Sequence, residues 1–312
     1  MSVLVVGGAG FIGSVLVKKL THLHKRIIVI DKLSLGKLDY LDTKSIDFIH
    51  EDINNIDNII KHLVNYGEIS EIWHLAANSD IPAGVHDMNI DLKDTFMSTI
   101  SIIEISKKLG IKRINFSSSS AIYGDLDQEL TEDIGPLMPI SNYGAMKLAS
   151  EAALSAAFES HLDSVSIYRF PNVVGVPATH GVILDFIRRL KESPDLLKVL
   201  GNGEQQKLYL HVNELIDAMF FINHETTEGL NYFNIGPNDK GITVKEIAQI
   251  VIDRVAPNAS ISYQKSKKGW PGDVPKFQYS IEKLKNIGWD SRSTSWDAIK
   301  TAVDEIAQQE GF

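Results

Sequence analysis

The strongest constraint on the fold is a regular alternation of short apolar runs and amphipathic stretches over the first 170 of 312 residues. Several of the short runs are apolar throughout, which is typical of parallel strands buried on both faces. Such alternation favours right-handed βαβ units in a doubly wound parallel α/β sheet. The predicted strands are residues 3–6, 26–30, 46–50, 71–75, 113–116 and 165–170, and the predicted helices are 11–20, 56–65, 92–109 and 143–159.

After Phe170 the alternation stops, and the rest of the sequence predicts a smaller α/β cap. Pro171, Gly175 and Pro177 predict a loop. Beyond it, helices are predicted at 182–191, 213–221, 244–254 and 295–308, with a short strand at 197–200. We expect a larger domain of residues 1–170 plus about 204–235, and a cap of about 171–203 plus 236–312.

Composition excludes several classes of function. The chain has 31 basic and 40 acidic residues, a formal net charge of −9, which disfavours nucleic acid as a partner. Because it has no cysteine, disulfides, thiolate metal sites and cysteine nucleophiles are excluded, and no histidine pattern predicts a metal site. No stretch approaches the ~18 apolar residues of a membrane helix, and no basic region precedes the apolar N-terminus. We therefore expect a cytoplasmic protein without a membrane partner.

A glycine-rich turn directly follows the first predicted strand and opens the first predicted helix. Its sequence is Gly7-Gly8-Ala9-Gly10-Phe11-Ile12-Gly13. Glycine lets the backbone approach a pyrophosphate, and the amides and dipole of the helix terminus stabilise the negative charge. Asp31, 18 residues after Gly13, can accept hydrogen bonds from the adenosine ribose and repel a 2′-phosphate. These features predict NAD as cofactor, while Lys32 beside Asp31 leaves NADP as the alternative.

Tyr143 and Lys147 form the candidate catalytic pair, because a spacing of four residues puts them on one helix face. A free tyrosine has a pKa near ~10, and lowering it by about 3 units requires ~4 kcal/mol. A nearby ammonium and a positive nicotinamide ring are able to lower it. Four serines, 117 to 120, follow the fifth predicted strand and offer a hydroxyl to a reacting oxygen.

These motifs resemble the extended, sugar-nucleotide-modifying branch of the short-chain dehydrogenase/reductase superfamily, in which a Rossmann domain carries a substrate-binding cap. The resemblance lies in the Gly-x-x-Gly-x-x-Gly spacing, the strand-end segment 74–78, and the Tyr-x-x-x-Lys pair. It implies an active-site hydroxyl at Ser119, with Ser120 as the alternative because four serines blur the register. Ser119, Tyr143 and Lys147 then complete a catalytic triad.

The same resemblance implies an NAD site at the ends of the predicted strands. Asp91 stands where many relatives have an asparagine near the nicotinamide, so that contact departs from the family pattern. The implied cofactor-binding residues are Gly7, Gly10, Phe11, Ile12, Gly13, Asp31, Lys32, Ser34, Gly36, Asp52, Ile53, Leu75, Ala76, Ala77, Ser117, Tyr143, Lys147 and Pro171.

The family's dehydratases usually carry an acid and a base directly after the active-site hydroxyl, and its decarboxylases carry a glutamate there. Here those positions are Ser120 and Ala121, neither of which can perform that proton transfer. The likeness is closest to 4-epimerases of the UDP-glucose/UDP-galactose type, which implies hydride transfer at C4 and a 4-keto intermediate. Tyr143 then takes the 4-hydroxyl proton, Lys147 holds the nicotinamide ribose and Ser119 bonds the sugar O4.

Two other functions are compatible with these residues. One is a 4-ketoreductase, or a 4-epimerase for an N-acetylated or deoxy sugar. The other is a catalytically idle NAD-binding regulator.

The resemblance also implies where a sugar nucleotide binds. Lys207 and Trp270 stand at positions where relatives have arginines, so the diphosphate is short of positive charge, and Arg188 or Arg189 are candidates to compensate. The implied substrate-binding residues are Ser119, Asn172, His180, Val182, Lys207, Trp270 and Asp273.

The predicted helices 92–109 and 143–159 have apolar residues beyond one core face. Relatives dimerise through these helices, so a homodimer is expected.

Overall fold

The computed structural model describes residues 1–23, 26–264 and 277–312, which form two compact units. Unit 1 consists of Met1–Gly124, Pro136–Arg169 and Met219–Phe233. Unit 2 consists of Asp125–Gly135, Phe170–Ala218 and Asn234–Phe312. The chain passes from unit 1 to unit 2 after Gly124 and again near residue 170. The sequence pattern predicts the boundary near residue 170 but not the one at Gly124.

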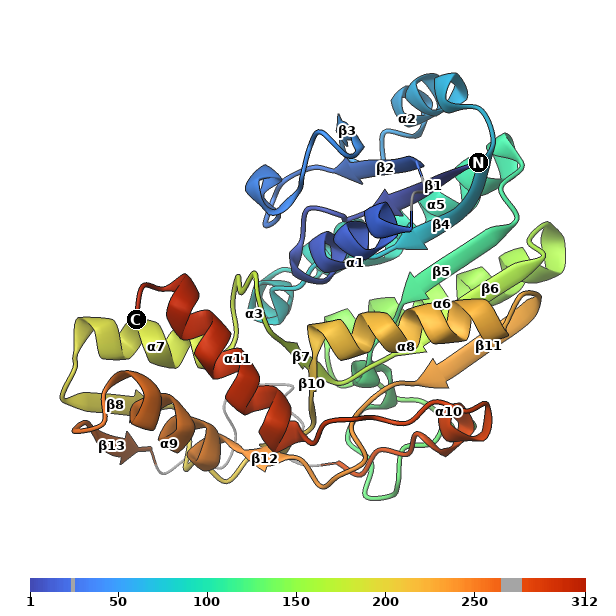
Figure 1. Cartoon of the computed structure of the whole chain (residues 1–312). Coiled ribbons are helices and arrows are strands. Elements are labelled where there is room, and N and C mark those ends of the chain that lie inside the picture. Colours follow the sequence, from blue (N-terminus) through green and yellow to red (C-terminus); the bar gives the residue numbers. More distant parts are fainter. Residues whose placement is uncertain (24–25, 265–276) are drawn as a thin grey trace. The chain divides into compact units, whose positions relative to one another are not determined.

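Unit 1 is built around a seven-stranded sheet with the order β11-β6-β5-β4-β1-β2-β3 (Figure 1). The neighbouring pairs from β6 to β3 are all parallel, so the prediction of a doubly wound parallel α/β sheet is confirmed. The strands are β1 (Ser2–Val6), β2 (Arg26–Asp31), β3 (Asp47–His50), β4 (Ile69–His74), β5 (Arg113–Ser117), β6 (Ser164–Arg169) and β11 (Gly229–Asn234).

The edge strand β11 was not among the predicted strands. Most of its side chains are only partly buried, and its sequence Gly-Leu-Asn-Tyr-Phe-Asn mixes apolar with polar residues. An edge strand has one sheet neighbour, so it does not need the continuous apolar run that marks a central parallel strand.

Helices cover both faces of the sheet (Figure 1). On one face α2, α5 and α6 bury side chains such as Ile59, Ile102 and Leu154 against the strands. On the other face lie α1 and the end of α8 (Val212–Glu225), where the Phe220 ring lies 5.4 Å from that of Trp73. The helices of unit 1 are α1 (Phe11–His22), α2 (Ile56–Leu63), α3 (Ile81–His86), α4 (Met88–Asp91), α5 (Ser98–Leu109) and α6 (Asn142–Ser160).

The helix predicted at 92–109 is not regular. It starts earlier, as α4, and passes through a π-helical segment, Leu92–Met97, before α5 begins. Hydroxyls in this stretch donate to main-chain carbonyls: Ser98 to Asp94 at 2.9 Å and Thr99 to Thr95 at 3.1 Å. Such bonds compete with regular helical bonds, and the apolar spacing of the sequence does not reveal them.

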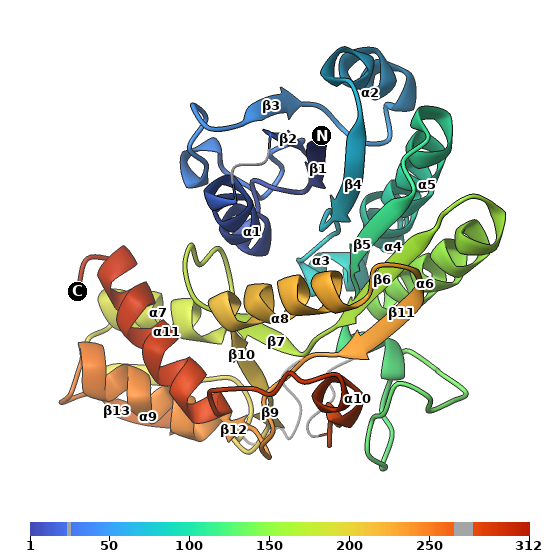
Figure 2. The same ribbon diagram turned by 45° about the vertical axis from the view of Figure 1, so that its right-hand side comes forward.

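Unit 2 has its own apolar core between α7 (Val182–Glu192), α9 (Val244–Val255) and α11 (Ser295–Gln309), which lie side by side in Figure 2. Short strands pair around this core, and a small helix, α10 (Glu282–Asn286), precedes α11. The strand pairs are β8 (Leu196–Val199) with β13 (Ser260–Tyr263), β7 (Asn172–Val174) with β10 (Tyr209–His211), and β9 (Gln206–Lys207) with β12 (Ile242–Thr243).

The loop predicted after Phe170 contains β7, so that prediction is wrong for residues 172–174. β7 pairs in parallel with β10, matching Asn172 with Tyr209. Because its partner lies far along the chain, the flanking Pro171 and Gly175 could not indicate this strand. In the described part of the chain, no helix is long and apolar enough to span a membrane.

Candidate active site

The cofactor residues predicted in unit 1 follow the ends of consecutive strands. Gly7 follows β1, Asp31 ends β2, Asp52 follows β3, Leu75 follows β4 and Ser117 ends β5. Because these strands are parallel, their carboxyl ends meet at one edge of the sheet, where open α/β sheets bind ligands. The sheet topology therefore brings these segments together at a single edge.

The glycine turn between β1 and α1 has the shape that a pyrophosphate requires. Gly7 has φ +81°, and a Cβ there would lie 2.6 Å from the backbone nitrogen of Ala76. A Cβ on Gly13 would lie 2.2 Å from the carbonyl oxygen of Gly7, whereas one on Gly10 would meet only that oxygen, at 3.4 Å. The N-cap Gly10 provides no side-chain cap for α1, which leaves first-turn amides to bind an anion. These residues therefore fit the pyrophosphate of a dinucleotide.

The Asp31 carboxylate holds the glycine turn in place, in addition to its predicted contact with the adenosine ribose. Its carboxylate accepts hydrogen bonds from the backbone nitrogens of Ala9, at 2.9 Å, and Leu33, at 2.8 Å. A carboxylate has about four acceptor positions, so two remain for ribose hydroxyls. Asp31 is therefore compatible with the predicted adenosine contact.

Lys32, the residue that left NADP open, is paired within the protein. Its Nζ lies 2.6 Å from Asp94 and 4.0 Å from Asp52, and Lys93 lies 3.6 Å from the same Asp52 oxygen. A 2′-phosphate would therefore meet three carboxylates, including Asp31, and an ammonium that is already neutralised. This charge distribution favours NAD.

The structure brings the three predicted catalytic side chains together. Lys147 is 1% exposed, donates to the Ser117 carbonyl at 2.5 Å and lies 5.8 Å from the centre of the Tyr143 ring. The Ser119 side chain acts on the Tyr143 phenol, whose pKa it lowers, and accepts from the Ala121 amide at 3.1 Å. This last bond caps a short 3₁₀ helix, Ser120–Tyr123, and fixes the position of the serine.

The proton affinities of the pair differ from the sequence expectation. Burial raises the pKa of Tyr143 to about 12, the negative charge of Asp91 adds to this rise, and the hydrogen bond with Ser119 opposes it. Burial also lowers the pKa of Lys147 to about 7, against the effect of Glu151. The protein groups alone therefore do not lower the phenol pKa, because desolvation disfavours the charged form of both residues. The expected lowering by the ammonium and the nicotinamide ring together stays a prediction.

Sequence reasoning missed a buried polar network behind the serines. Arg169 donates to Glu151 at 2.7 and 3.1 Å and to the Tyr123 hydroxyl at 3.0 Å, while Ser118 donates to Glu151. The signals available were an arginine ending an apolar strand and a glutamate one turn after Lys147. The network ties α6 and β6 to the segment that carries Ser119.

The predicted substrate residues other than Ser119 belong to unit 2 or lie outside the described residues. Asn172 is in β7 and donates to the Leu208 carbonyl at 3.1 Å, and Lys207 is in β9. His180 is exposed, with its Nδ1 2.9 Å from the Thr179 hydroxyl, and Val182 begins α7. Those outside the described residues are Trp270 and Asp273.

Arg188 and Arg189, the suggested compensating cations, are both bound within unit 2. Arg188 pairs with Glu310 at 2.9 Å, and Arg189 donates to the Lys198 carbonyl at 2.7 Å. These contacts give both guanidinium groups a structural role, which weakens their case as diphosphate ligands.

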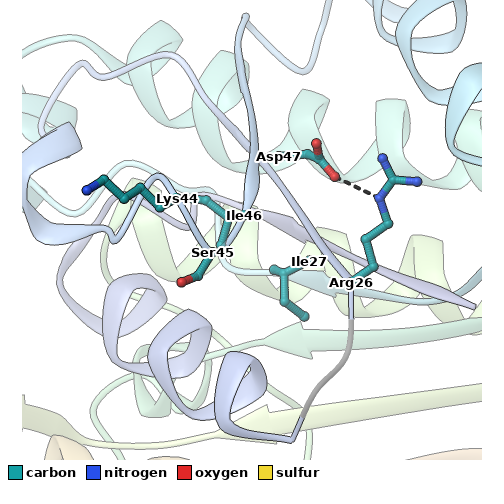
Figure 3. Close-up of a pocket in the computed structure, with 6 residues that line it drawn as sticks. All are labelled: Arg26, Ile27, Lys44, Ser45, Ile46 and Asp47. Atoms are coloured by element: carbon teal, nitrogen blue, oxygen red, sulfur yellow. Dashed lines mark hydrogen bonds and ion pairs between the residues drawn. The ribbon is translucent and has the colours of Figure 1, made fainter.

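A small hollow lies at the opposite, amino-terminal ends of β2 and β3 (Figure 3). There Arg26 forms an ion pair with Asp47 at 2.8 Å, and the remaining lining residues are Ile27, Lys44, Ser45 and Ile46. Its position separates it from the predicted site. Within residues 1–23, 26–264 and 277–312, no group of three acidic, histidine or cysteine side chains could hold a metal ion.

A doubly wound parallel sheet, a glycine turn after β1 and a Ser–Tyr–Lys group after β5 define a dinucleotide-dependent enzyme of the short-chain dehydrogenase/reductase type. The chain belongs to the NAD-dependent epimerase/dehydratase family, whose model matches residues 3–236. The expectations of NAD as cofactor and of an enzyme of the sugar-nucleotide epimerase type are confirmed.

Similar proteins cover almost the whole chain. A putative UDP-glucose 4-epimerase of Methanocaldococcus jannaschii is 27% identical over 97% of both chains. A UDP-N-acetyl-α-D-glucosaminuronate decarboxylase of Bacillus cytotoxicus is 28% identical over 94% of both. The crystal structure of UDP-glucose 4-epimerase from Thermotoga maritima with UDP-glucose has a TM-score of 0.88, 27% identity, and coverage of 99% of this chain and 100% of that one.

Proposed function

We propose that the protein is a 4-epimerase of a UDP-hexose of the UDP-glucose/UDP-galactose type. The observation that carries this proposal is the placement of Ser119 and Lys147 beside the Tyr143 phenol, with Ala121, whose methyl group cannot transfer a proton, two residues after Ser119. Such a site supports oxidation and reduction at one carbon. It does not support the elimination of water. It also does not support decarboxylation, the reaction for which the Bacillus cytotoxicus relative is named.

In this reaction the chain's residues orient the sugar and move one proton. Tyr143 takes the proton of the sugar 4-hydroxyl and returns it after the 4-keto sugar has turned over. Ser119 donates to the sugar O4. Lys147, whose ammonium donates to the Ser117 carbonyl, also holds the nicotinamide ribose. NAD, held by the glycine turn and Asp31, supplies reversible hydride transfer at C4.

The phenol must lose its proton for this role, although burial holds its pKa at about 12. Bound oxidised cofactor would supply a positive charge, and an opposite charge within ~4–6 Å of a phenol lowers its pKa. Epimerisation therefore depends on bound oxidised cofactor for its base as well as for its hydride acceptor.

For the substrate, we propose that unit 2 is the binding cap. It contains the predicted cap, about 171–203 plus 236–312, and also residues 125–135 and 204–218, the latter predicted to belong to the larger domain. Asn172 and Lys207 then contact the diphosphate, and Pro171 lines the nicotinamide site. The remaining proposed contacts are His180, Val182, Trp270 and Asp273.

Incubation of the purified protein with UDP-galactose, without added cofactor, tests the function. We expect UDP-glucose to form at catalytic turnover, because NAD is regenerated in each cycle. Consumption of added NADH or NADPH with a 4-keto sugar nucleotide would instead identify a ketoreductase, and no turnover with any of these would identify the idle regulator.

The matched variant is Tyr143→Phe, which removes the hydroxyl and keeps the ring. We expect a loss of turnover of at least 10²-fold, as for removal of a general base, with NAD still bound. A Tyr143→Phe protein with wild-type turnover would exclude Tyr143 as the base.

We also propose a homodimer formed through the α4–α5 region and α6. Leu92, Met97 and Met88 are 38–52% exposed there and offer apolar surface to a second copy of the chain. Light scattering at micromolar concentration should give twice the mass of the chain, and a monomer would reject this proposal.

A further inference from the structure

Asp91, at the end of α4, is a buried carboxylate that is only half satisfied. The residue is 0% exposed, and its Oδ1 accepts a hydrogen bond from the Asn78 side chain at 2.8 Å. Its Oδ2 is also buried and has no hydrogen-bond partner. A buried unpaired acceptor is costly, and functional sites are one of the places where that cost is retained.

The surroundings of Asp91 bring it close to the segment that carries the phenol. A Cβ on Gly84 would lie 1.9 Å from the Asp91 Oδ2, so the carboxylate occupies the space beside that glycine. The Gly84 carbonyl accepts a hydrogen bond at 2.8 Å from Asn142, the residue before Tyr143. Asp91 is therefore connected to the start of α6 through a single backbone position.

We propose that Asp91 is a positioning residue that controls the proton on the Tyr143 phenol through the negative charge of its buried carboxylate. The charge acts through poorly polarisable surroundings, because neither Asp91 nor Gly84 is exposed. An ionised Asp91 opposes the tyrosinate, so the protein resists forming the base until a positive charge is present beside it. Asp91 thus couples formation of the base to the oxidised cofactor.

Other charged groups lie near Asp91 and Tyr143. Lys147 lies on α6 beside Tyr143, and its own neighbour is Glu151. Asp94, in the π-helical segment, acts on Asp91, but its charge is paired with Lys32. Within the described residues, Asp91 has no ion pair, whereas Asp94 is paired with Lys32 at 2.6 Å.

The test is Asp91→Asn, which removes the charge and keeps both size and the acceptor for Asn78. The readout is the tyrosinate ultraviolet absorbance of the protein as purified, with the matching Tyr143→Phe protein subtracted at each pH. We expect the Tyr143 titration to move down by about one pH unit, the effect of one close charge. Below the midpoint this raises the tyrosinate fraction about tenfold.

Asp87→Asn is the matched control. Asp87 is an exposed carboxylate that caps α4 by accepting from the Asn89 amide at 3.0 Å, and asparagine retains that acceptor. Asp87→Asn removes the same charge from the same helix, but at an exposed position, so the Tyr143 titration should stay in place. Asp91→Ala provides a second charge-removing variant if Asp91→Asn folds poorly, and should shift the titration in the same direction.

The inference rests on the proposed role of Tyr143 as base, yet the titration needs no substrate. If UDP-galactose is not epimerised but Asp91→Asn shifts the titration, the proposed function fails and the coupling stands. If epimerisation occurs, the ascending limb of kcat/KM against pH should move down by the same amount. A Tyr143 titration that is the same in wild type, Asp91→Asn and Asp91→Ala would overturn the inference.

Discussion

At the scale of single residues, burial decides what the site's functional groups can do. Tyr143 and Lys147 are four residues apart, but the lysine ammonium donates to the Ser117 carbonyl. Removal from water disfavours the charged form of each residue, so the pKa of Tyr143 rises and the pKa of Lys147 falls. Spacing therefore predicts the neighbours, whereas their protonation depends on how deeply the helix is packed.

The pairing of Lys32 predicts how cofactor selectivity can be changed. Asp94→Ala removes the carboxylate that holds the Lys32 ammonium at 2.6 Å and lowers the negative charge near a 2′-phosphate. We expect the Kd for NADP to fall about two- to fivefold, the range for a partly exposed ion pair, while the Kd for NAD changes little. Calorimetric titration of nucleotide-free protein measures both.

Asp57→Ala is the control, because Asp57 is an exposed carboxylate whose contact with Lys108 is 4.0 Å long. It should leave both affinities unchanged. Equal NADP affinities in Asp94→Ala and wild type would show that Lys32 does not approach the 2′ position.

At the scale of elements, the strand ends after β5 and β6 are held by α6. Glu151 of this helix bonds Arg169 of β6 and Ser118 in the turn after β5. The guanidinium also lies 5.4 Å from the Tyr123 ring and 5.1 Å from the Tyr232 ring. One charged pair therefore fixes the relative position of two strands and the catalytic helix.

Breaking this pair from one side should destabilise unit 1 strongly. Arg169→Met leaves the Glu151 charge buried without its partner, so we expect a loss of about 3–5 kcal/mol in the free energy of unfolding. Urea denaturation measures this loss. Tyr123→Phe removes the hydroxyl that accepts from the guanidinium at 3.0 Å and leaves the ion pair with Glu151 in place, so it should lose about 1.5–3 kcal/mol.

The double variant Arg169→Met/Glu151→Gln separates the two contributions. Glutamine keeps an acceptor for Ser118 but carries no charge, so we expect the double variant to recover part of the stability lost by Arg169→Met. If it is no more stable than Arg169→Met, the loss comes from missing packing rather than from an unpaired charge.

At the scale of the whole molecule, the parallel sheet buries groups that titrate freely in the unfolded chain. His74, at the end of β4, is 0% exposed, and its Nε2 lies 3.0 Å from the Thr99 hydroxyl. Burial, together with the nearby Lys147, lowers the pKa of His74 to about 3. The folded protein therefore keeps this ring neutral through most of the acidic range.

This burial predicts a pH dependence of stability. Between pH 6.5 and about 3 the unfolded chain binds a proton at His74 that the folded chain does not, so stability falls as the pH falls. The contribution approaches about 1.4 kcal/mol per pH unit. His74→Gln should reduce the acid dependence of urea unfolding by this amount, while His224→Gln, at an 86% exposed side chain, should not. Equal slopes in His74→Gln and wild type would contradict the prediction.

Much of unit 1 could be predicted because its signals are local. Buried parallel strands need continuous apolar runs, and a pyrophosphate turn needs glycine where a Cβ would strike the backbone, as at Gly7 and Gly13. The carboxyl-edge position of Asp31 follows from the direction of β2. Unit 2 was less predictable, because β7 and β10 are short strands whose pairing joins distant parts of the chain.

The sequence by itself determined the class of fold, the cofactor turn and the shared helix face of Tyr143 and Lys147, because each shows in a local pattern of residues. Only the tertiary structure decided which charges pair, as with Lys32 and Asp94, 62 residues apart. It also left one oxygen of Asp91 unpaired and fixed the phenol's proton affinity. These properties depend on desolvation and on contacts between distant segments, which no local pattern of residues records.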